Sequence, residues 1–89
     1  MATNIAHPYI EEKQGVGRGR FIIKGTRTRV KNLVAYYKLG YTPDELAREF
    51  PHLSLSKIYD ALSFYHDHVE EIDKEIEEES EEHLKKTEK

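Results

Sequence analysis

The chain has 89 residues, a length that suits one small domain, and it has no cysteine, which excludes a disulfide framework and a thiolate metal site. No apolar stretch approaches the roughly 20 residues that span a bilayer, and the first residues lack the long apolar run of a secretory signal, so we expect a cytoplasmic protein. The net charge of −3 hides an asymmetry: residues 1–65 hold ten basic and six acidic residues, whereas residues 66–89 hold four and eleven.

The N-terminal part predicts a small β-ribbon or hairpin within about residues 8–30. A weak strand is expected around residues 8–11, and a β-rich run follows at residues 21–24. The sequence Gly-Thr-Arg then predicts a turn, after which residues 28–30 are expected to return as a second short strand.

Two short helices are predicted next. Apolar residues at helical spacing indicate a helix that begins near Val30 and stops close to Gly40. A second helix is expected over about residues 43–50. Thr42 caps this helix, Pro43 suits its first position, and Glu45 completes a capping box.

A third, long helix is expected to begin near Leu55, with Ser54 or Ser56 at its start. It carries a continuous apolar stripe of Ile58, Ala61, Leu62, Tyr65, Val69, Ile72 and Ile76. The predicted fold class is therefore mainly α: a three-helix helix-turn-helix core, homeodomain-like, with a short N-terminal β-ribbon and a long C-terminal helix. The helix-turn-helix domain is expected over residues 1–69, and an acidic helical extension or frayed tail over residues 70–89.

The chain resembles the domain-of-unknown-function family 433, which comprises small prokaryotic proteins regarded as antitoxin-like. The resemblance covers roughly residues 5–71 and rests on the turn at residues 24–27, on the helix followed by Thr-Pro-Asp-Glu-Leu, and on Phe-Pro-His-Leu-Ser-Leu at residues 50–55. It implies a helix-turn-helix domain with a short β element, a homodimer, and a place in a toxin–antitoxin operon with a nuclease-like toxin as partner.

The predicted helix-turn-helix and a basic window favour contact with operator DNA. Seven basic residues and no acidic one lie in residues 13–31. The candidate DNA-binding residues are Arg18, Arg20, Lys24, Arg29 and Lys31 in this window, and Ser56, Lys57 and Tyr59 on the third helix. For Thr26 and Arg27 a structural role in the turn is favoured. Asp60 counts against DNA contact, and a plain three-helix scaffold is the alternative.

The acidic C-terminal segment is a candidate surface for a toxin partner. The candidate partner-binding residues are Ile72, Glu75, Ile76 and Glu79. Two alternatives remain open: the segment covers the domain's own basic window, or it is a solvated helix end.

The sequence predicts no enzyme, no cofactor and no metal site. His66 and Glu70 have the spacing of a helical ligand pair, but no third ligand follows at a suitable distance along the chain. Our first hypothesis is a small dimeric DNA-binding regulator of a toxin–antitoxin operon. The rival hypotheses are a protein-interaction module that neutralises a toxin without touching DNA, and a protein that binds RNA through stacked tyrosines.

Overall fold

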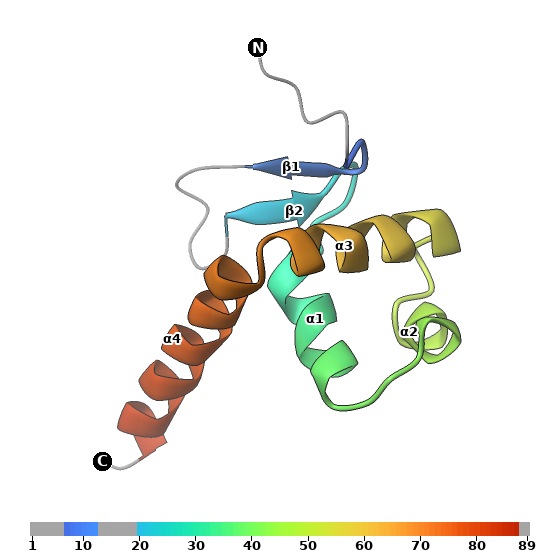
Figure 1. Cartoon of the computed structure of the whole chain (residues 1–89). Helices are drawn as coiled ribbons and strands as arrows, with labels where there is room; N and C mark the ends of the chain where they lie inside the picture. Colours follow the sequence, from blue (N-terminus) through green and yellow to red (C-terminus); the bar gives the residue numbers. More distant parts are fainter. Residues whose placement is uncertain (1–6, 13–19, 88–89) are drawn as a thin grey trace.

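The computed structural model describes residues 7–12 and 20–87, with side chains described as far as residue 78. It confirms a mainly helical protein with a short two-stranded antiparallel sheet near the N-terminus (Figure 1). The elements in chain order are β1 (Ile10–Glu12), β2 (Phe21–Ile23), α1 (Val30–Lys38), α2 (Pro43–Glu49), α3 (Leu55–Asp67) and α4 (Val69–Thr87).

The β-ribbon differs from the predicted hairpin in which segments pair. β1 pairs antiparallel with β2, so that Ile10 lies opposite Ile23. The expected return strand at residues 28–30 is wrong, because only a single bridge joins Arg29 to Ile22 and the chain enters α1 at Val30. The apolar face of α1 accounts for this early start, since burying it requires helical spacing from the first residue onward.

The caps of α1 and α2 follow the sequence signals. Gly40, just after α1, has a φ of +108°, which a residue with a side chain rarely adopts. Thr42 and Glu45 form the predicted capping box, in which the Thr42 hydroxyl accepts the Glu45 N–H at 3.2 Å and the Glu45 carboxylate accepts the Thr42 N–H at 2.9 Å. Both short helices therefore have defined ends.

The single long third helix predicted from the sequence is wrong, because the structure has two helices there. α3 ends at His68, whose φ of −135° and ψ of 44° are not helical, and α4 leaves in a new direction (Figure 1). The His68 ring stacks on Phe64 with ring centroids 4.2 Å apart. The His68 ring also lies 6.2 Å from the ring of Phe21 and 6.5 Å from that of His7, so side chains from distant parts of the chain gather at this break, where the sequence has no glycine or proline.

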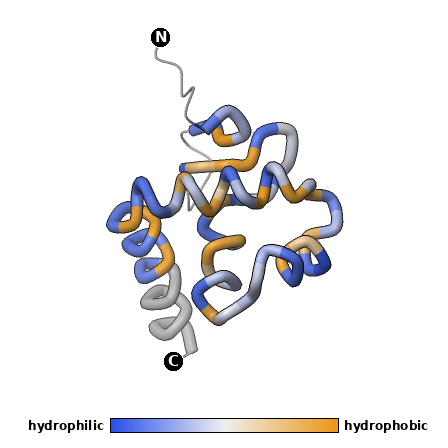
Figure 2. The backbone as a smooth tube through the Cα atoms, turned by 45° about the vertical axis from the view of Figure 1, so that its right-hand side comes forward, coloured by the Kyte–Doolittle hydropathy of each residue, from blue (hydrophilic) through white to orange (hydrophobic). Residues whose placement is uncertain are grey.

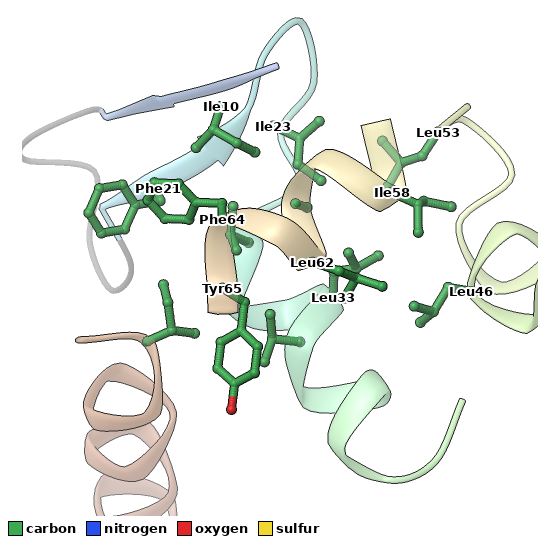
Figure 3. Close-up of a cluster of buried hydrophobic side chains, with 14 residues drawn as sticks. Ile10, Phe21, Ile23, Leu33, Leu46, Leu53, Ile58, Leu62, Phe64 and Tyr65 are labelled. Atoms are coloured by element: carbon green, nitrogen blue, oxygen red, sulfur yellow. The ribbon is translucent and has the colours of Figure 1, made fainter. Parts of the chain in front are cut away.

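One hydrophobic core joins every element (Figure 3). α3 lies at its centre and is buried on two sides: Phe64 packs against Phe21 of the ribbon with ring centroids 4.8 Å apart, while Ile58 and Leu62 belong to the side that faces α1 and α2. The described part of α4 is mostly hydrophilic (Figure 2), yet Ile72 in its first turn is completely buried in this core.

A polar contact adds to the attachment of α4. The Asp73 carboxylate accepts hydrogen bonds from the Lys38 ammonium at 2.8 Å and from the Tyr65 hydroxyl at 2.9 Å. These two donors, the Lys38 ammonium above all, hold the pKa of Asp73 below its usual value. Among the described residues, no helix is long and apolar enough to cross a membrane.

Candidate nucleic-acid interface

The first two turns of α3 present polar side chains to solvent. The Ser54 hydroxyl accepts the Lys57 N–H at 3.2 Å, which identifies Ser54 as the residue that caps this helix. The helix then buries Ile58 and leaves Ser56 exposed, Tyr59 56% exposed and Lys57 half-exposed. Three of the predicted DNA-binding side chains therefore lie near the N-terminal end of α3, off its buried face.

A tight turn between β2 and α1 also belongs to the candidate interface. Gly25 has a φ of +80°, and the Thr26 hydroxyl donates to the Ile23 carbonyl at 2.8 Å while it accepts the Thr28 N–H at 3.0 Å. The structural role predicted for Thr26 is thus confirmed. The Thr28 hydroxyl in turn lies 2.6 Å from Nε2 of His52, which joins this turn to the turn between α2 and α3.

Two basic side chains, Arg27 and Lys57, lie where these turns adjoin α3, and Lys24 directly follows β2. Lys24 and Arg27 are exposed, and neither forms an ion pair with another described residue. The Lys57 ammonium lies over the turn, because a Cβ added at Gly25 would be 4.0 Å from it. Arg27 was expected to hold the turn together, but within the described part of the chain it makes no such contact and is exposed.

Asp60, which counted against contact with phosphates, is engaged by the N-terminal segment. Its carboxylate accepts the Tyr9 N–H at 2.8 Å and lies 3.3 Å from Nδ1 of His7. The other ring nitrogen of His7 lies 2.7 Å from Asp67, and His7 is only 4% exposed. These contacts leave Asp60 half-buried and direct its carboxylate toward the N-terminal segment.

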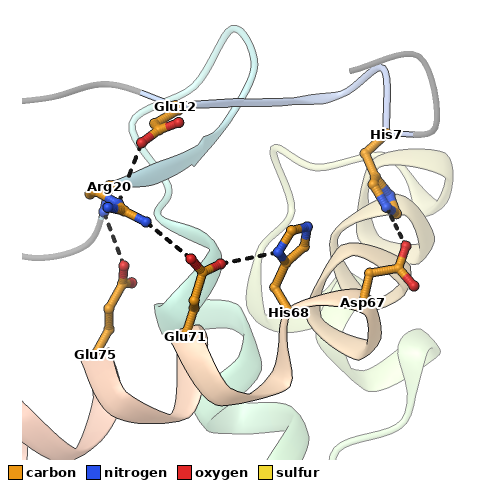
Figure 4. Close-up of polar contacts among 7 residues, drawn as sticks. All are labelled: His7, Glu12, Arg20, Asp67, His68, Glu71 and Glu75. Atoms are coloured by element: carbon orange, nitrogen blue, oxygen red, sulfur yellow. Dashed lines mark hydrogen bonds and ion pairs between the residues drawn. The ribbon is translucent and has the colours of Figure 1, made fainter. Parts of the chain in front are cut away.

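Arg20 lies at the junction between the ribbon and α4, away from α3. Its guanidinium is 3.5 Å from both Glu12 and Glu71, and its backbone N–H donates to Glu75 at 3.5 Å (Figure 4). The side chain is 48% exposed, so these contacts are loose. At Arg20, the acidic helix contacts the basic window in the way that the self-covering alternative expects.

Two other basic residues predicted to contact DNA, Lys31 and Arg29, are less exposed to solvent. Lys31, in the first turn of α1, is 3% exposed, which leaves it no face for a phosphate to reach. Arg29 is half-buried at the N-terminal cap of α1. Arg18 lies outside the described residues.

The predicted partner-binding residues whose side chains the structure describes are buried or half-buried. Ile72 is fully buried and Ile76 is half-buried against the same core, so the chain itself occupies the apolar stripe of α4. Glu75 is half-buried beside Arg20. Glu79 lies in α4, and its side chain is outside the described part. The exposed acidic side chains described on this helix are Glu70, Glu71, Glu77 and Glu78.

The environment of the Glu75 carboxyl predicts how the stability of the protein depends on pH. Burial raises its pKa above the usual 4.5 despite the nearby Arg20. Because the folded state then holds this proton more tightly than the unfolded chain, the contribution of Glu75 to stability falls as pH rises above about 4.5. The Glu75→Gln variant should therefore be at least as stable as the wild type at pH 7, with any advantage fading at low pH.

Thermal unfolding across a pH series measures this effect. Glu78→Gln, which removes an exposed carboxylate from the same helix, is the matched control and should follow the wild-type profile. A Glu75→Gln protein that is clearly less stable than wild type at neutral pH would show that the contact with Arg20 dominates instead.

Sequence reasoning missed two buried residues that position α3, and with it the candidate interface. Phe64 lies three residues after Ala61, so helical spacing was a signal that it is buried. It was missed because it lies next to the apolar stripe predicted for the third helix and not on it. His7 offered no signal, because its contacts lie 53 and 60 residues away in the chain. Both residues hold α3 against the N-terminal segment.

The fold and site define a small, mainly helical domain with a basic turn beside the start of its central helix. Within the described ranges, no group of three or more His, Asp or Glu side chains is arranged to hold a metal ion. The chain belongs to the DUF433 family, described as "Protein of unknown function (DUF433)", whose model matches residues 10–65. No curated protein and no solved structure matched the chain.

Proposed function

We propose that this protein is a small DNA-binding regulator in which α2, the following turn and α3 act as a helix-turn-helix. In this proposal α3 enters the major groove with its N-terminal end, where Ser56 and Tyr59 contact base edges or backbone. Lys57, Lys24 and Arg27 contact phosphates on either side of the groove.

The observation that carries the proposal is the position of these three cations. Arg27 and Lys57 line one groove at the exposed start of α3, Lys24 directly precedes the turn, and none of the three forms an ion pair within the described part of the chain. Asp60, the acidic residue on the same stretch of α3, is engaged by His7 and Tyr9. A polyanion would therefore meet positive charge at this end of the helix.

The resemblance that the sequence shows to antitoxin-like proteins extends the proposal. A homodimer in the cytoplasm would place two copies of α3 on two operator half-sites, and a nuclease-like toxin would be the protein partner. Because Ile72 and Ile76 pack against the protein's own core, the toxin would meet the exposed carboxylates of α4 rather than an apolar stripe.

Binding to duplex DNA taken from upstream of the protein's own gene tests the first part. Lys57→Ala should weaken binding about tenfold at low salt, because one phosphate contact is lost. The matched control is Lys74→Ala, which removes the same charge from an exposed position on α4 and should bind like the wild type. Fluorescence anisotropy of labelled duplex measures both.

Equal weakening by the two lysine variants would mean that only net charge matters and would overturn the assigned interface. If the wild type retains no DNA but captures a toxin through α4, the protein-interaction hypothesis replaces the regulator. The acidic outer face of α4 is the feature that favours this second function.

A further inference from the structure

A groove lies between the β2–α1 turn, the α2–α3 turn and the first turn of α3. This groove is open to solvent and has a volume of about 540 Å³. Its lining comes from four segments that are separate in the chain and includes Arg27, Thr28, Phe50, His52 and Lys57. Such a volume lies within the range of small-ligand sites in proteins.

The charge of the lining favours an anion. Arg27 and Lys57 contribute two cations, and none of the lining residues carries a carboxylate. The Lys57 ammonium is held above Gly25, where a Cβ would come within 4.0 Å of it. A guanidinium and an ammonium on one groove are the groups that proteins use to bind phosphate.

The walls of the groove are organised by contacts within the protein. The Thr26 hydroxyl closes the turn through Ile23 and Thr28, and Thr28 contacts His52 across the groove wall at 2.6 Å. Within this turn, the backbone N–H groups of Gly25 and Arg27 donate to no described residue. Backbone N–H groups without an internal acceptor in a tight turn are suited to bind anions.

An apolar side chain adds a second element of recognition. The Phe50 ring lies edge-to-face against Tyr36 at 5.4 Å and against His52 at 6.3 Å, so neighbouring rings restrict its orientation. The groove is larger than a phosphate ion requires, and Phe50 gives the remaining space an aromatic wall. A phosphate attached to a sugar and a base fits this combination of charge and apolar surface.

The geometry points to a nucleotide phosphate site in this groove, with Arg27 and Lys57 holding the phosphate and Phe50 contacting the attached nucleoside. The phosphate comes either from a free nucleotide or from the backbone of a nucleic acid. The second source rests on the proposed function, because the same face would then lie on DNA.

The test follows backbone amide chemical shifts of Gly25, Thr26 and Lys57 in the full chain by NMR. Thymidine 5′-monophosphate, thymidine without phosphate and duplex DNA are titrated separately. We expect saturable shifts with a phosphate-bearing probe and none with thymidine. The Arg27→Gln/Lys57→Gln variant should lose them, and the Lys38→Gln/Lys74→Gln variant, with the same charge removed at a distance, should keep them.

Each outcome decides one point. Saturation by the mononucleotide identifies a free nucleotide as a ligand, while shifts with duplex DNA alone identify the phosphate as part of a nucleic acid. No shift with either probe, or equal shifts with thymidine, overturns the groove as a phosphate site. If duplex DNA shifts the amides of Ser56 and Tyr59 while Gly25 and Thr26 stay unaffected, DNA binding through α3 stands, but this inference and the phosphate contact assigned to Arg27 both fail. If the mononucleotide binds and DNA does not, this inference stands and the proposed function fails.

Discussion

Replacing Phe64 by alanine should lower the free energy of unfolding by about 3–5 kcal/mol, the range for a buried phenylalanine whose site cannot collapse. Phe64 is 2% exposed and contacts three other rings: Phe21 at 4.8 Å, His68 at 4.2 Å and His7 at 5.2 Å. Its removal would leave a cavity where β2, α3 and the N-terminal segment meet. For a small domain this is a large share of the total stability.

Urea denaturation followed by circular dichroism measures the loss. The matched control is Tyr59→Ala on the same helix, where the ring is 56% exposed and the expected change is within about 0.5 kcal/mol. A Phe64→Ala loss below about 1 kcal/mol would contradict the central position assigned to this ring.

Replacing Ile72 by alanine should cost about 2–5 kcal/mol, because this side chain is fully buried between α4 and the rest of the core. The result separates two interpretations of the acidic helix. If Ile72 belonged to a partner interface, as its place in the sequence predicts, the isolated protein would scarcely lose stability.

Ile72→Val serves as a graded companion variant and should cost about 0.5–1.5 kcal/mol. Glu78→Ala, on the exposed side of α4, should leave stability nearly unchanged. If Ile72→Ala unfolds at the same urea concentration as wild type, α4 does not pack on α1 in solution, and the toxin surface proposed for the helix must be revised.

Local signals in the sequence were sufficient for the short helices. The capping box of Thr42 and Glu45 and the glycine after α1 act over a few residues, and the structure has both where the sequence predicts them. The spacing of Val30, Leu33 and Val34 also identified the buried face of α1 correctly. Such features depend on backbone hydrogen bonds and on periodicity, which a sequence displays directly.

Features that depend on distant contacts were not predictable in the same way. α3 ends where the His68 ring lies near Phe21 and His7, which are 47 and 61 residues earlier in the chain, and no glycine or proline marks the break. The orientation of Asp60 depends on His7, more than 50 residues earlier in the chain. The burial of Ile72 follows from the direction that α4 takes after that break.

The same distinction applies to the candidate interface. The sequence identified Lys24 as part of the basic window and Lys57 as a basic residue near the start of the third helix, off its apolar stripe. It did not show that Lys57 lies above Gly25, because that proximity arises only when two separate turns pack together. It favoured a structural role for Arg27 and DNA contact for Lys31, whereas the structure exposes Arg27 and buries Lys31.

The salt dependence of DNA binding tests the assigned interface most directly. Each phosphate contact contributes a slope of about −0.9 to the plot of log K against log salt concentration. We expect Arg27→Gln/Lys57→Gln to make this slope shallower by about 2, and Lys38→Gln/Lys74→Gln to leave it unchanged, although each variant loses two positive charges. Identical slopes for the two double variants, or a wild type that binds no DNA at any salt concentration, would contradict the account.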